Sequence, residues 1–224
     1  MNSSNCRFVI LISGRGSNLN AIIDALQRHD ATEQVCAVIS NNSDAPGLSR
    51  AQERKIATRV VSHQDYPTRE LFDRALGDAI DAYRPDYILL AGFMRILTPE
   101  FVERFGGRLI NIHPSLLPAF PGLKTHQQAL SAGVQWHGCT VHFVTSDLDH
   151  GPIIAQGVVP VCKNDTPDTL AQRILRVEHH IYGDVALWLS QGRVTLDATQ
   201  RVHVDGVVSR SYILTPEGVR HSTF

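Results

Sequence analysis

An amide and an imidazole interrupt a short apolar run that otherwise has the composition of a buried strand. The run is Leu109, Ile110 and Ile112, and the polar residues within it are Asn111 and His113. Side chains two residues apart in a strand project from the same face, so the amide and the imidazole are expected to lie side by side. A structural histidine is the commoner occupant of such a position. Two features favour a catalytic role here. Burying polar groups in a strand is costly. The pair also lies at the carboxyl end of the strand, where α/β sheets bind their ligands.

The chemistry that fits this pair is acyl transfer without a covalent enzyme intermediate. A carboxylate is needed beside the imidazole, and Asp147 and Asp149 lie in a turn-rich loop that Gly151 and Pro152 close. A neighbouring carboxylate favours the cationic form of an imidazole. The amide N–H and the imidazolium would then stabilise an oxyanion, while the carboxylate handles protons.

The other histidines and the cysteines form no motif that predicts a metal or a covalent nucleophile. His137, His142 and His150 are spaced five and eight residues apart, which matches neither HExxH nor a Cys/His zinc pattern. The sequence contains no GxSxG motif of serine hydrolases, and its four cysteines include no CxxC pair. We therefore expect no catalytic metal, and reduced thiols that take no part in the chemistry.

A second candidate site follows the predicted strand Phe8–Ile12. The polar turn 13–18, SGRGSN, leads into a predicted helix at Leu19–Arg28. This arrangement can cradle a phosphate, because backbone N–H groups and a helix N-terminus both favour an anion. Leu19 stands where a dinucleotide fingerprint has its third glycine, and the Gly-Lys-Ser/Thr of a P-loop is absent. From these residues alone, a phosphate site and a plain tight turn are equally compatible with the segment.

An apolar loop at 92–97, GFMRIL, follows the predicted strand Tyr87–Ala91. Loops at strand ends are usually polar, so this composition suits the lining of a flat, mostly apolar ligand pocket. Burial beneath the predicted helix Pro99–Phe105 explains the composition equally well. After the catalytic candidates, three prolines stiffen the loop 114–121, since proline fixes φ and restricts the preceding residue.

The remaining hydrophobic pattern alternates strands with helices, which predicts an α/β fold. Further strands are expected at Val35–Ser40, Thr58–Val61, Val141–Val144 and Ile153–Val161, the last two as a hairpin. Further helices are expected at Pro46–Arg54, Pro67–Tyr83, Thr125–Ala132 and Pro167–Leu189. In the helix 67–83, the residues predicted to face the core are Leu71, Ala75, Leu76 and Ile80. The tail from Gly192 alternates apolar and polar residues, which predicts two or three short strands that include an edge hairpin.

Composition limits the class of protein. The chain has 224 residues, 43% of them hydrophobic, and a formal net charge of −1 without a long block of one sign. This balance argues against a dedicated nucleic-acid-binding or membrane-surface protein. The start Met1–Cys6 is polar and no apolar run approaches the length of about 20 residues that crosses a bilayer. We therefore expect no signal peptide, no membrane span and a cytoplasmic protein.

The segment Asn111–Pro118, NIHPSLLP, resembles the signature of enzymes that use 10-formyltetrahydrofolate. Three more segments narrow the resemblance, namely SGRGSNL at 13–19, AGFMRIL at 91–97 and HGCTVHFV at 137–144. Together they are similar to the phosphoribosylglycinamide formyltransferase family of purine biosynthesis. The resemblance runs in order and without large gaps over about residues 7–195.

This resemblance implies a Rossmann-like, mostly parallel twisted sheet flanked by helices, with an antiparallel C-terminal hairpin extension. A single formyltransferase domain would span 1–224, with a phosphate-binding half at about 1–105, a catalytic and folate-binding half at about 106–195, and C-terminal strands at 196–224. The implied reaction transfers a formyl group from 10-formyltetrahydrofolate to the amine of 5'-phosphoribosylglycinamide. It would proceed by direct attack through a tetrahedral intermediate, with the folate as co-substrate and no metal.

The resemblance also assigns roles to residues. The catalytic ones would be Asn111, His113 and Asp149, supported by His142 and Thr140. Those that hold the ribonucleotide would be Gly16, Ser17, Asn18, Arg69, Pro114 and Glu178. Those that hold the folate, largely through backbone groups at 94–97, would be Met94, Arg95, Ile96, Leu97, Val144 and Asp149. Position 150, where glycine is common in the family, carries a histidine, which tolerates positive φ less well than glycine does.

Two other functions are alternatives at this point. A formyltetrahydrofolate hydrolase would use the same three catalytic residues on water and would not need the phosphate turn. A non-catalytic folate- or nucleotide-binding module typically lacks one of the three, and all are present here. A tRNA formyltransferase would need a basic C-terminal domain, which this tail does not provide. We expect small-molecule substrates, no nucleic-acid or membrane partner, and a monomer or homodimer.

Overall fold

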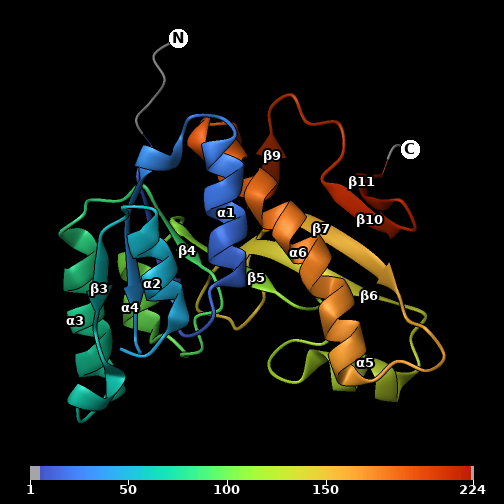
Figure 1. The fold of residues 1–224 in the computed structure, drawn as a ribbon, viewed down its shortest axis with the longest axis horizontal. Helices are drawn as coiled ribbons and strands as arrows, with labels where there is room; N and C mark the ends of the chain where they lie inside the picture. The colour runs from blue at the N-terminus through green and yellow to red at the C-terminus, as the bar shows by residue number, and fades with distance from the viewer. Residues whose placement is uncertain (1–5, 223–224) are drawn as a thin grey trace.

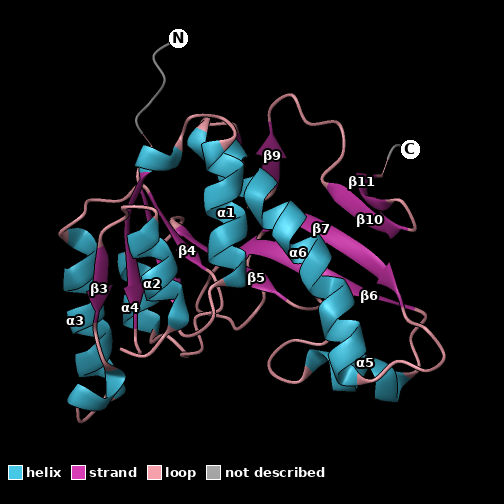
Figure 2. Cartoon of the chain, in the orientation of Figure 1, coloured by secondary structure: helices cyan, strands magenta, loops and turns pink. Residues whose placement is uncertain are grey.

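The computed structural model describes residues 6–222 and arranges them around one nine-stranded sheet (Figures 1 and 2). The strands of this sheet are β1 Phe8–Ile12, β2 Val35–Ser40, β3 Thr58–Val60, β4 Tyr87–Leu90, β5 Leu109–His113, β6 Trp136–Phe143, β7 Ile153–Pro160, β10 Ser211–Thr215 and β11 Gly218–His221. A separate two-stranded sheet pairs β8 Val194–Leu196 with β9 Val202–Val204. The predicted polar start lies, apart from Cys6, outside the described residues, as does the end of the predicted domain at 223–224.

Six α-helices are described, with short 3₁₀ turns at Thr32–Gln34 and His63–Asp65. The helices are α1 Ser17–Gln27, α2 Pro46–Glu53, α3 Arg69–Asp81, α4 Pro99–Arg104, α5 Thr125–Ala132 and α6 Pro167–Ser190. Their positions confirm the expected alternation of strands and helices, with boundaries that differ by a few residues. None of the helices within 6–222 has the length and apolarity that crossing a membrane requires.

The sheet is mostly parallel. Its order is β11-β10-β7-β6-β5-β4-β1-β2-β3, and the five strands from β5 to β3 all run the same way. β6 is antiparallel to β5 and β7 is antiparallel to β6, whereas β10 joins β7 in parallel and β11 closes that edge antiparallel. The Rossmann-like sheet and the C-terminal hairpin are as predicted. Because β1, β2, β4 and β5 are parallel, the segments that follow them meet at one edge.

Side chains of the parallel strands alternate between two cores, one on each face of the sheet. In β1, Phe8, Ile10 and Ile12 belong to the core beneath α1, α2 and α6, and Val9 and Leu11 belong to the core beneath α3 and α4. All five residues of β1 are buried. A strand covered by helices on both faces is expected to be apolar throughout, as this one is.

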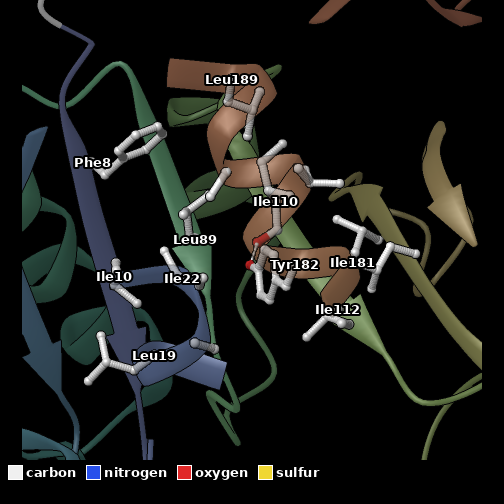
Figure 3. Packing of buried hydrophobic residues seen from close by; sticks show 14 of the residues in the cluster. Phe8, Ile10, Leu19, Ile22, Leu89, Ile110, Ile112, Ile181, Tyr182 and Leu189 are labelled. Carbon is white, nitrogen blue, oxygen red and sulfur yellow. Dashed lines mark hydrogen bonds between the residues drawn. The ribbon is translucent and has the colours of Figure 1, made fainter. Parts of the chain in front are cut away.

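Helix α6 lies beside α1 on the first face, as the orange and blue helices of Figure 1 show. A Cβ added to Gly183 of α6 would lie only 2.8 Å from Cβ of Ala25 in α1, so glycine permits the close approach. Figure 3 shows Tyr182 of α6 directed at the sheet, where its hydroxyl lies 3.1 Å from the carbonyl oxygens of Leu90 in β4 and Ile110 in β5. These contacts hold α6 over the strands that carry the catalytic candidates.

One predicted core position is wrong. Leu71 is predicted to face the core, but its side chain is 42% exposed, while the neighbouring Phe72 is buried. The buried face of α3 runs through Phe72, Leu76 and Ile80, which are spaced four residues apart. Leu71 is one residue out of step with that spacing, and one residue corresponds to about 100° around a helix.

Short strands are predicted after residue 192 and are found there, but they number four, in two hairpins, where two or three are predicted. The second hairpin, β10–β11, extends the edge of the main sheet. Tyr212 of β10 is 1% exposed, and its hydroxyl donates to Oδ2 of Asp184 in α6 at 2.9 Å. The tail is therefore packed into the fold as well as paired with it.

Candidate active site

Asn111 and His113 occupy β5 at the two-residue spacing that places them on one face. In the ladder with β6, Asn111 pairs with His142 and His113 pairs with Thr140. The Nδ2 atom of Asn111 lies 3.4 Å from Nε2 of His142, whose Nδ1 lies 2.9 Å from the carbonyl oxygen of Phe143. Burial lowers the pKa of His142, so the neutral ring donates to the carbonyl and accepts from the amide. His142 thereby orients the Asn111 side chain.

Asp149 is the acid that the structure brings to His113. Its Oδ2 atom lies 3.5 Å from Nδ1 of His113 and accepts the Gly122 N–H at 2.8 Å. Its Oδ1 atom lies 3.9 Å from Nε2 of His142. The side chains of His113 and Asp149 are only 7% and 8% exposed, whereas Asp147 is exposed. The geometry therefore places Asp149, and not Asp147, beside His113, which the spacing alone could not decide.

The loop that carries Asp149 has its left-handed residue at the aspartate itself. The φ angle of Asp149 is 57°, and aspartate is one of the side chains that tolerate this region. His150 has no positive φ, so histidine fits the backbone where the family often has glycine. Its ring is exposed, and Nδ1 lies 2.6 Å from the carbonyl oxygen of Leu148.

The second ring nitrogen of His113 also faces an acceptor. Nε2 lies 3.1 Å from the carbonyl oxygen of Phe120, a residue of the proline loop with a φ of 53°. The carboxylate of Asp149 lies on the other side of the ring, 3.5 Å from Nδ1. Each ring nitrogen of His113 therefore has an acceptor oxygen beside it.

A buried hydrogen-bond network fixes the proline loop, which includes the cis peptide Leu117–Pro118. Thr140 Oγ1 donates to the carbonyl oxygen of Ser115 at 2.7 Å and accepts the Leu117 N–H at 3.1 Å. Gln156 of β7 donates from Nε2 to the Leu117 carbonyl at 2.9 Å and to Thr140 Oγ1 at 3.0 Å. The sequence analysis missed Gln156, although a glutamine inside the apolar strand IIAQGVVP is a signal that could have identified it.

The turn after β1 has the features of an anion site. Gly16 is the N-cap of α1 with a φ of 70°, and the first turn of that helix contains no acidic residue. The first turn thus carries no carboxylate of its own, and its N–H groups favour a negative ligand. Across 160 residues of sequence, Asn18 Nδ2 donates to Oε2 of Glu178 at 2.9 Å. Glu178 is 8% exposed, and burial raises its pKa.

Helix α2 contacts this turn through Gly47. The N–H of Gly47 donates to the carbonyl oxygen of Gly14 at 3.1 Å. A Cβ at Gly47 would lie 2.5 Å from Ile12 Cδ1 and 3.3 Å from Gly16 Cα, so only glycine fits without a shift. The sequence analysis missed Gly47. The signal for it is the Pro46-Gly47 pair at the start of a helix, where proline is favoured but glycine has no local advantage.

Comparison with known proteins identifies the family. Residues 6–186 match the formyl transferase family. The chain is 51% identical over 188 residues to the phosphoribosylglycinamide formyltransferase of Escherichia coli (strain K12), which covers 84% of this chain and 89% of the relative. The structure of the Coxiella burnetii phosphoribosylglycinamide formyltransferase in complex with CHES has a TM-score of 0.83 at 48% identity, covering 90% of this chain and 94% of the other. The chain belongs to the phosphoribosylglycinamide formyltransferases.

The fold of this formyltransferase also resembles that of a deformylase. A formyltetrahydrofolate deformylase from Pseudomonas putida KT2440 has a TM-score of 0.79 at 31% identity, covering 91% of this chain and 71% of that one. Architecture alone therefore does not separate transfer from hydrolysis. The identity to the transferases is higher, and it extends over nearly their whole length.

In this formyltransferase the apolar loop after β4 faces outward. Met94 is 75% exposed and Ile96 is 65% exposed, while Phe93 is buried. Burial beneath α4 therefore does not explain Met94 and Ile96, and the loop presents apolar side chains as a ligand pocket would. The N–H of Met94 donates to Oγ of Ser13 at 2.7 Å, so this backbone group is already used within the protein.

The other residues predicted to bind the folate are less exposed than Met94 and Ile96. Leu97 and Val144 are partly buried against the core beneath α3 and α4, and Arg95 is partly exposed. A cavity of about 510 Å³ opens next to Asp149, lined by Pro121, Gly122, Asp147, Leu148 and His150. Leu148 is 57% exposed at its mouth. This lining could hold an aromatic ring system beside the acid.

Two predicted ribonucleotide residues are less closely tied to the turn. Arg69 is the first residue of α3 and its side chain is exposed. Among the described residues it makes no hydrogen bond to the turn or to Glu178. Pro114 directly follows His113, and its carbonyl oxygen accepts from Oγ1 of Thr125 at 2.7 Å. The structure thus joins Asn18 to Glu178 and leaves Arg69 free to turn toward a ligand.

Within residues 6–222, no group of three histidine, cysteine, aspartate or glutamate side chains is arranged to hold a metal ion. His137, one of the candidates considered for a metal, is fully buried, and burial lowers its pKa to about 4. Its ring packs edge-on against His126 and Phe120. His137 is a neutral core residue beneath the proline loop.

Proposed function

We infer that this formyltransferase transfers the formyl group of 10-formyltetrahydrofolate to the amine of 5'-phosphoribosylglycinamide in purine biosynthesis. This inference rests on one observation, that two features lie at the same edge of the sheet. The first is the buried His113–Asp149 pair beside Asn111. The second is the anion-type turn at the start of α1, joined to Glu178 through Asn18.

In the proposed reaction the ribonucleotide amine attacks the formyl carbon directly. The Asn111 amide stabilises the oxyanion of the tetrahedral intermediate by donating a hydrogen bond. Protonated His113, whose ring nitrogens face Asp149 and the Phe120 carbonyl, stabilises it through its positive charge. Asp149 maintains the positive charge of His113 and relays the proton of the amine, through water, to N10 of the folate. The bond from carbon to N10 then breaks, which releases tetrahydrofolate and the formylated ribonucleotide. No covalent enzyme intermediate and no metal take part.

The proposed ribonucleotide site places the phosphate on the N–H groups of Gly16, Ser17 and Asn18. The free N-terminus of α1 supports this position because it carries partial positive charge. Glu178 would accept a hydrogen bond from a sugar hydroxyl or from the amine, with Pro114 against the same ligand. Arg69 would close on the ribonucleotide from α3, where its side chain is exposed.

The proposed folate site takes the pterin ring between the 94–97 segment and the loop of Asp149. Support comes from the exposed apolar side chains of Met94 and Ile96 and from the cavity of about 510 Å³. Arg95, Leu97 and Val144 would complete the site, with backbone groups of the segment other than the Met94 N–H binding the ring edge. Folate is a consumed co-substrate in this scheme.

We propose that the chain works as a single formyltransferase domain on small molecules, as a monomer or homodimer, without nucleic-acid or membrane partners. The near-neutral net charge of −1 supports the absence of a nucleic-acid role. The free thiols of all four cysteines support a reducing, cytoplasmic setting.

The test is an assay of the purified protein with 10-formyltetrahydrofolate, in the presence and absence of glycinamide ribonucleotide. We expect tetrahydrofolate and formylated ribonucleotide to form in equal amounts, and only when both substrates are present. Release of formate without the ribonucleotide would identify a hydrolase instead. Binding of folate without any turnover would identify a non-catalytic module.

A further inference from the structure

A row of hydrogen bonds joins the ends of three neighbouring strands at the edge that carries the active site. Ser13 follows β1, Asn41 follows β2 and Met94 lies beyond β4, and these strands are adjacent in the order β2-β1-β4. The Met94 N–H donates to Ser13 Oγ at 2.7 Å, and the Ser13 hydroxyl donates to Asn41 Oδ1 at 2.5 Å. One serine side chain thus links the turn 13–18 to the segment 92–97.

The serine holds this segment at two points. Besides the bond from Met94, the Ser13 N–H donates to the carbonyl oxygen of Gly92 at 3.2 Å. The direction of the hydroxyl is fixed in turn by Asn41, which is only 4% exposed and whose Nδ2 lies 3.1 Å from Nδ1 of His63. The link is therefore a preformed part of the fold and does not depend on a mobile surface side chain.

Two hydrogen bonds to Ser13 reach the backbone of this segment where its packing is weakest. Phe93 is buried and Leu97 is partly buried in the core beneath α3 and α4, whereas Met94 and Ile96 are 75% and 65% exposed. The backbone around Met94 is therefore held partly by these polar contacts, and the loss of one is expected to let it move. The contact that connects it to the neighbouring ligand site is the Ser13 hydroxyl.

We propose that Ser13 is a positioning residue that couples the two substrate sites. A phosphate seated on the turn 13–18 would steady Ser13, and Ser13 would hold 92–97 in the arrangement that receives the folate. Because coupling of binding is reciprocal, the folate would strengthen ribonucleotide binding by the same factor. This inference rests on the proposed function, since it needs the phosphate at 13–18 and the folate at 92–97.

The test measures the Kd of tetrahydrofolate by calorimetry with and without saturating glycinamide ribonucleotide. Tetrahydrofolate carries no formyl group, so the ternary complex does not react. We expect the ribonucleotide to tighten tetrahydrofolate binding about 5-fold in the wild type, within the usual range of coupling between sites. In Ser13→Ala the factor falls to about 1, and in steady state KM for 10-formyltetrahydrofolate rises more than kcat falls.

Two further variants separate coupling from general damage. Ser43→Ala is the matched control and should keep the wild-type factor. Ser43 lies exposed at the same sheet edge, and within residues 6–222 its side chain bonds only to its neighbour Asp44. Ser13→Thr retains the hydroxyl and should restore most of the coupling. If Ser13→Ala does not fold, Asn41→Ala serves instead, since it releases the hydroxyl and should also reduce the factor.

The outcomes distinguish this inference from the proposed function. A wild-type protein that turns over only with the ribonucleotide, but shows the same tetrahydrofolate Kd with and without it, would overturn the coupling and leave the function intact. An unchanged factor in Ser13→Ala would overturn the role of Ser13. Absence of ribonucleotide-dependent turnover in the wild type would remove the function and the inference with it.

Discussion

The three proposed catalytic residues are fixed by different physical means. Asn111 and His113 are on a strand with period two, so the sequence predicts that they lie together. Asp149 is on a loop, and its place beside His113 depends on a φ of 57° and on the Gly122 N–H. No periodicity predicts such a loop, which is why spacing alone left Asp147 and Asp149 equivalent and the family resemblance was needed to choose.

Replacing Asn111 tests the oxyanion site. We expect Asn111→Ala to reduce kcat by about 10²- to 10³-fold, the usual effect of losing one oxyanion donor. The melting temperature should change little, because the Asn111 contact to His142 is long at 3.4 Å. Asn164→Ala, at an exposed position remote in sequence from the site, is the control. A kcat within a few-fold of wild type would show that the amide is not a donor to the oxyanion.

Replacing Glu178 tests whether this buried carboxyl lowers the stability of the fold while it serves ligand binding. Burial raises the pKa of this carboxyl in the folded chain, so the unfolded chain loses its proton first and stability falls as pH rises above the ordinary glutamate range. Glu178→Gln cannot ionise and keeps an acceptor for Asn18. We expect its melting temperature to exceed that of the wild type at pH 8, by a difference that shrinks toward pH 4.

In a protein of this size, a change of about 1 kcal/mol in the free energy of unfolding shifts the melting temperature by roughly 2–4 °C. The variant should also bind glycinamide ribonucleotide more weakly, seen as a higher KM. A melting temperature below that of the wild type at pH 8 would mean that the buried carboxylate stabilises the fold, contrary to this account.

At the scale of elements, the start of α6 is held by a network that places the helix and with it Glu178. Asp165 accepts from both terminal nitrogens of Arg173, at 2.6 and 2.8 Å, and from the Cys162 N–H at 2.7 Å. The Arg173 guanidinium lowers the pKa of Asp165 to about 2. Thr166 and Thr169 add a capping box. The sequence predicts a helix that begins at Pro167, but the ion pair eight residues apart is not apparent from it.

We expect Asp165→Asn to lower the free energy of unfolding by about 1.5–3 kcal/mol at pH 7, the usual range for hydrogen bonds to a charged group. The lowered pKa means that the wild-type advantage is complete above the ordinary aspartate range and is lost as pH falls from about 4 toward about 2. Denaturant unfolding at pH 7 and pH 3 measures both effects. Asp168, which is exposed in the first turn of α6, provides the control. Asp168→Asn should lower the free energy of unfolding much less than Asp165→Asn does. An equal loss would mean that a negative charge near the helix N-terminus matters more than the ion pair.

Strand and helix positions were predictable because apolar periodicity is local. The predicted strand Phe8–Ile12 matches β1 residue for residue, and the apolar run that begins at Leu109 lies in β5 as expected. The residues that the sequence analysis missed, Gln156 and Gly47, act through contacts with distant segments. A glutamine inside an apolar strand marks Gln156 as unusual, but its partner in the proline loop, 39 residues away in the sequence, cannot be inferred from its neighbours.

For the whole molecule, the question is what the tail contributes. The C-terminal hairpin packs Tyr212 against α6 and pairs β10 with β7, and it carries none of the proposed site residues. We expect Tyr212→Ala to lower the free energy of unfolding by about 3–5 kcal/mol, as for other large buried rings. KM for both substrates should stay within about 2-fold of wild type. A large change in either KM would show that the tail shapes the site.

Strand order was the least predictable property of the whole molecule. The hydrophobic pattern identified the strands, but the place of β1 between β2 and β4 decides that Ser13, Met94 and the catalytic strand are neighbours. That order depends on long-range packing of α1, α3 and α6 on the two faces, which no local pattern contains. The resemblance to a known family supplied it as an implied Rossmann-like fold.

The most direct test of the catalytic assignment is single-turnover formyl transfer by Asp149→Asn, with Asp147→Asn as its control in the same loop. The amide keeps the size of the side chain but removes the charge that faces His113 at 3.5 Å. We expect the rate of transfer to fall by about 10²- to 10⁴-fold in Asp149→Asn, with both ligands still bound, and to be unchanged in the exposed Asp147→Asn. A near-wild-type rate in Asp149→Asn would contradict its proposed role as the acid of the site.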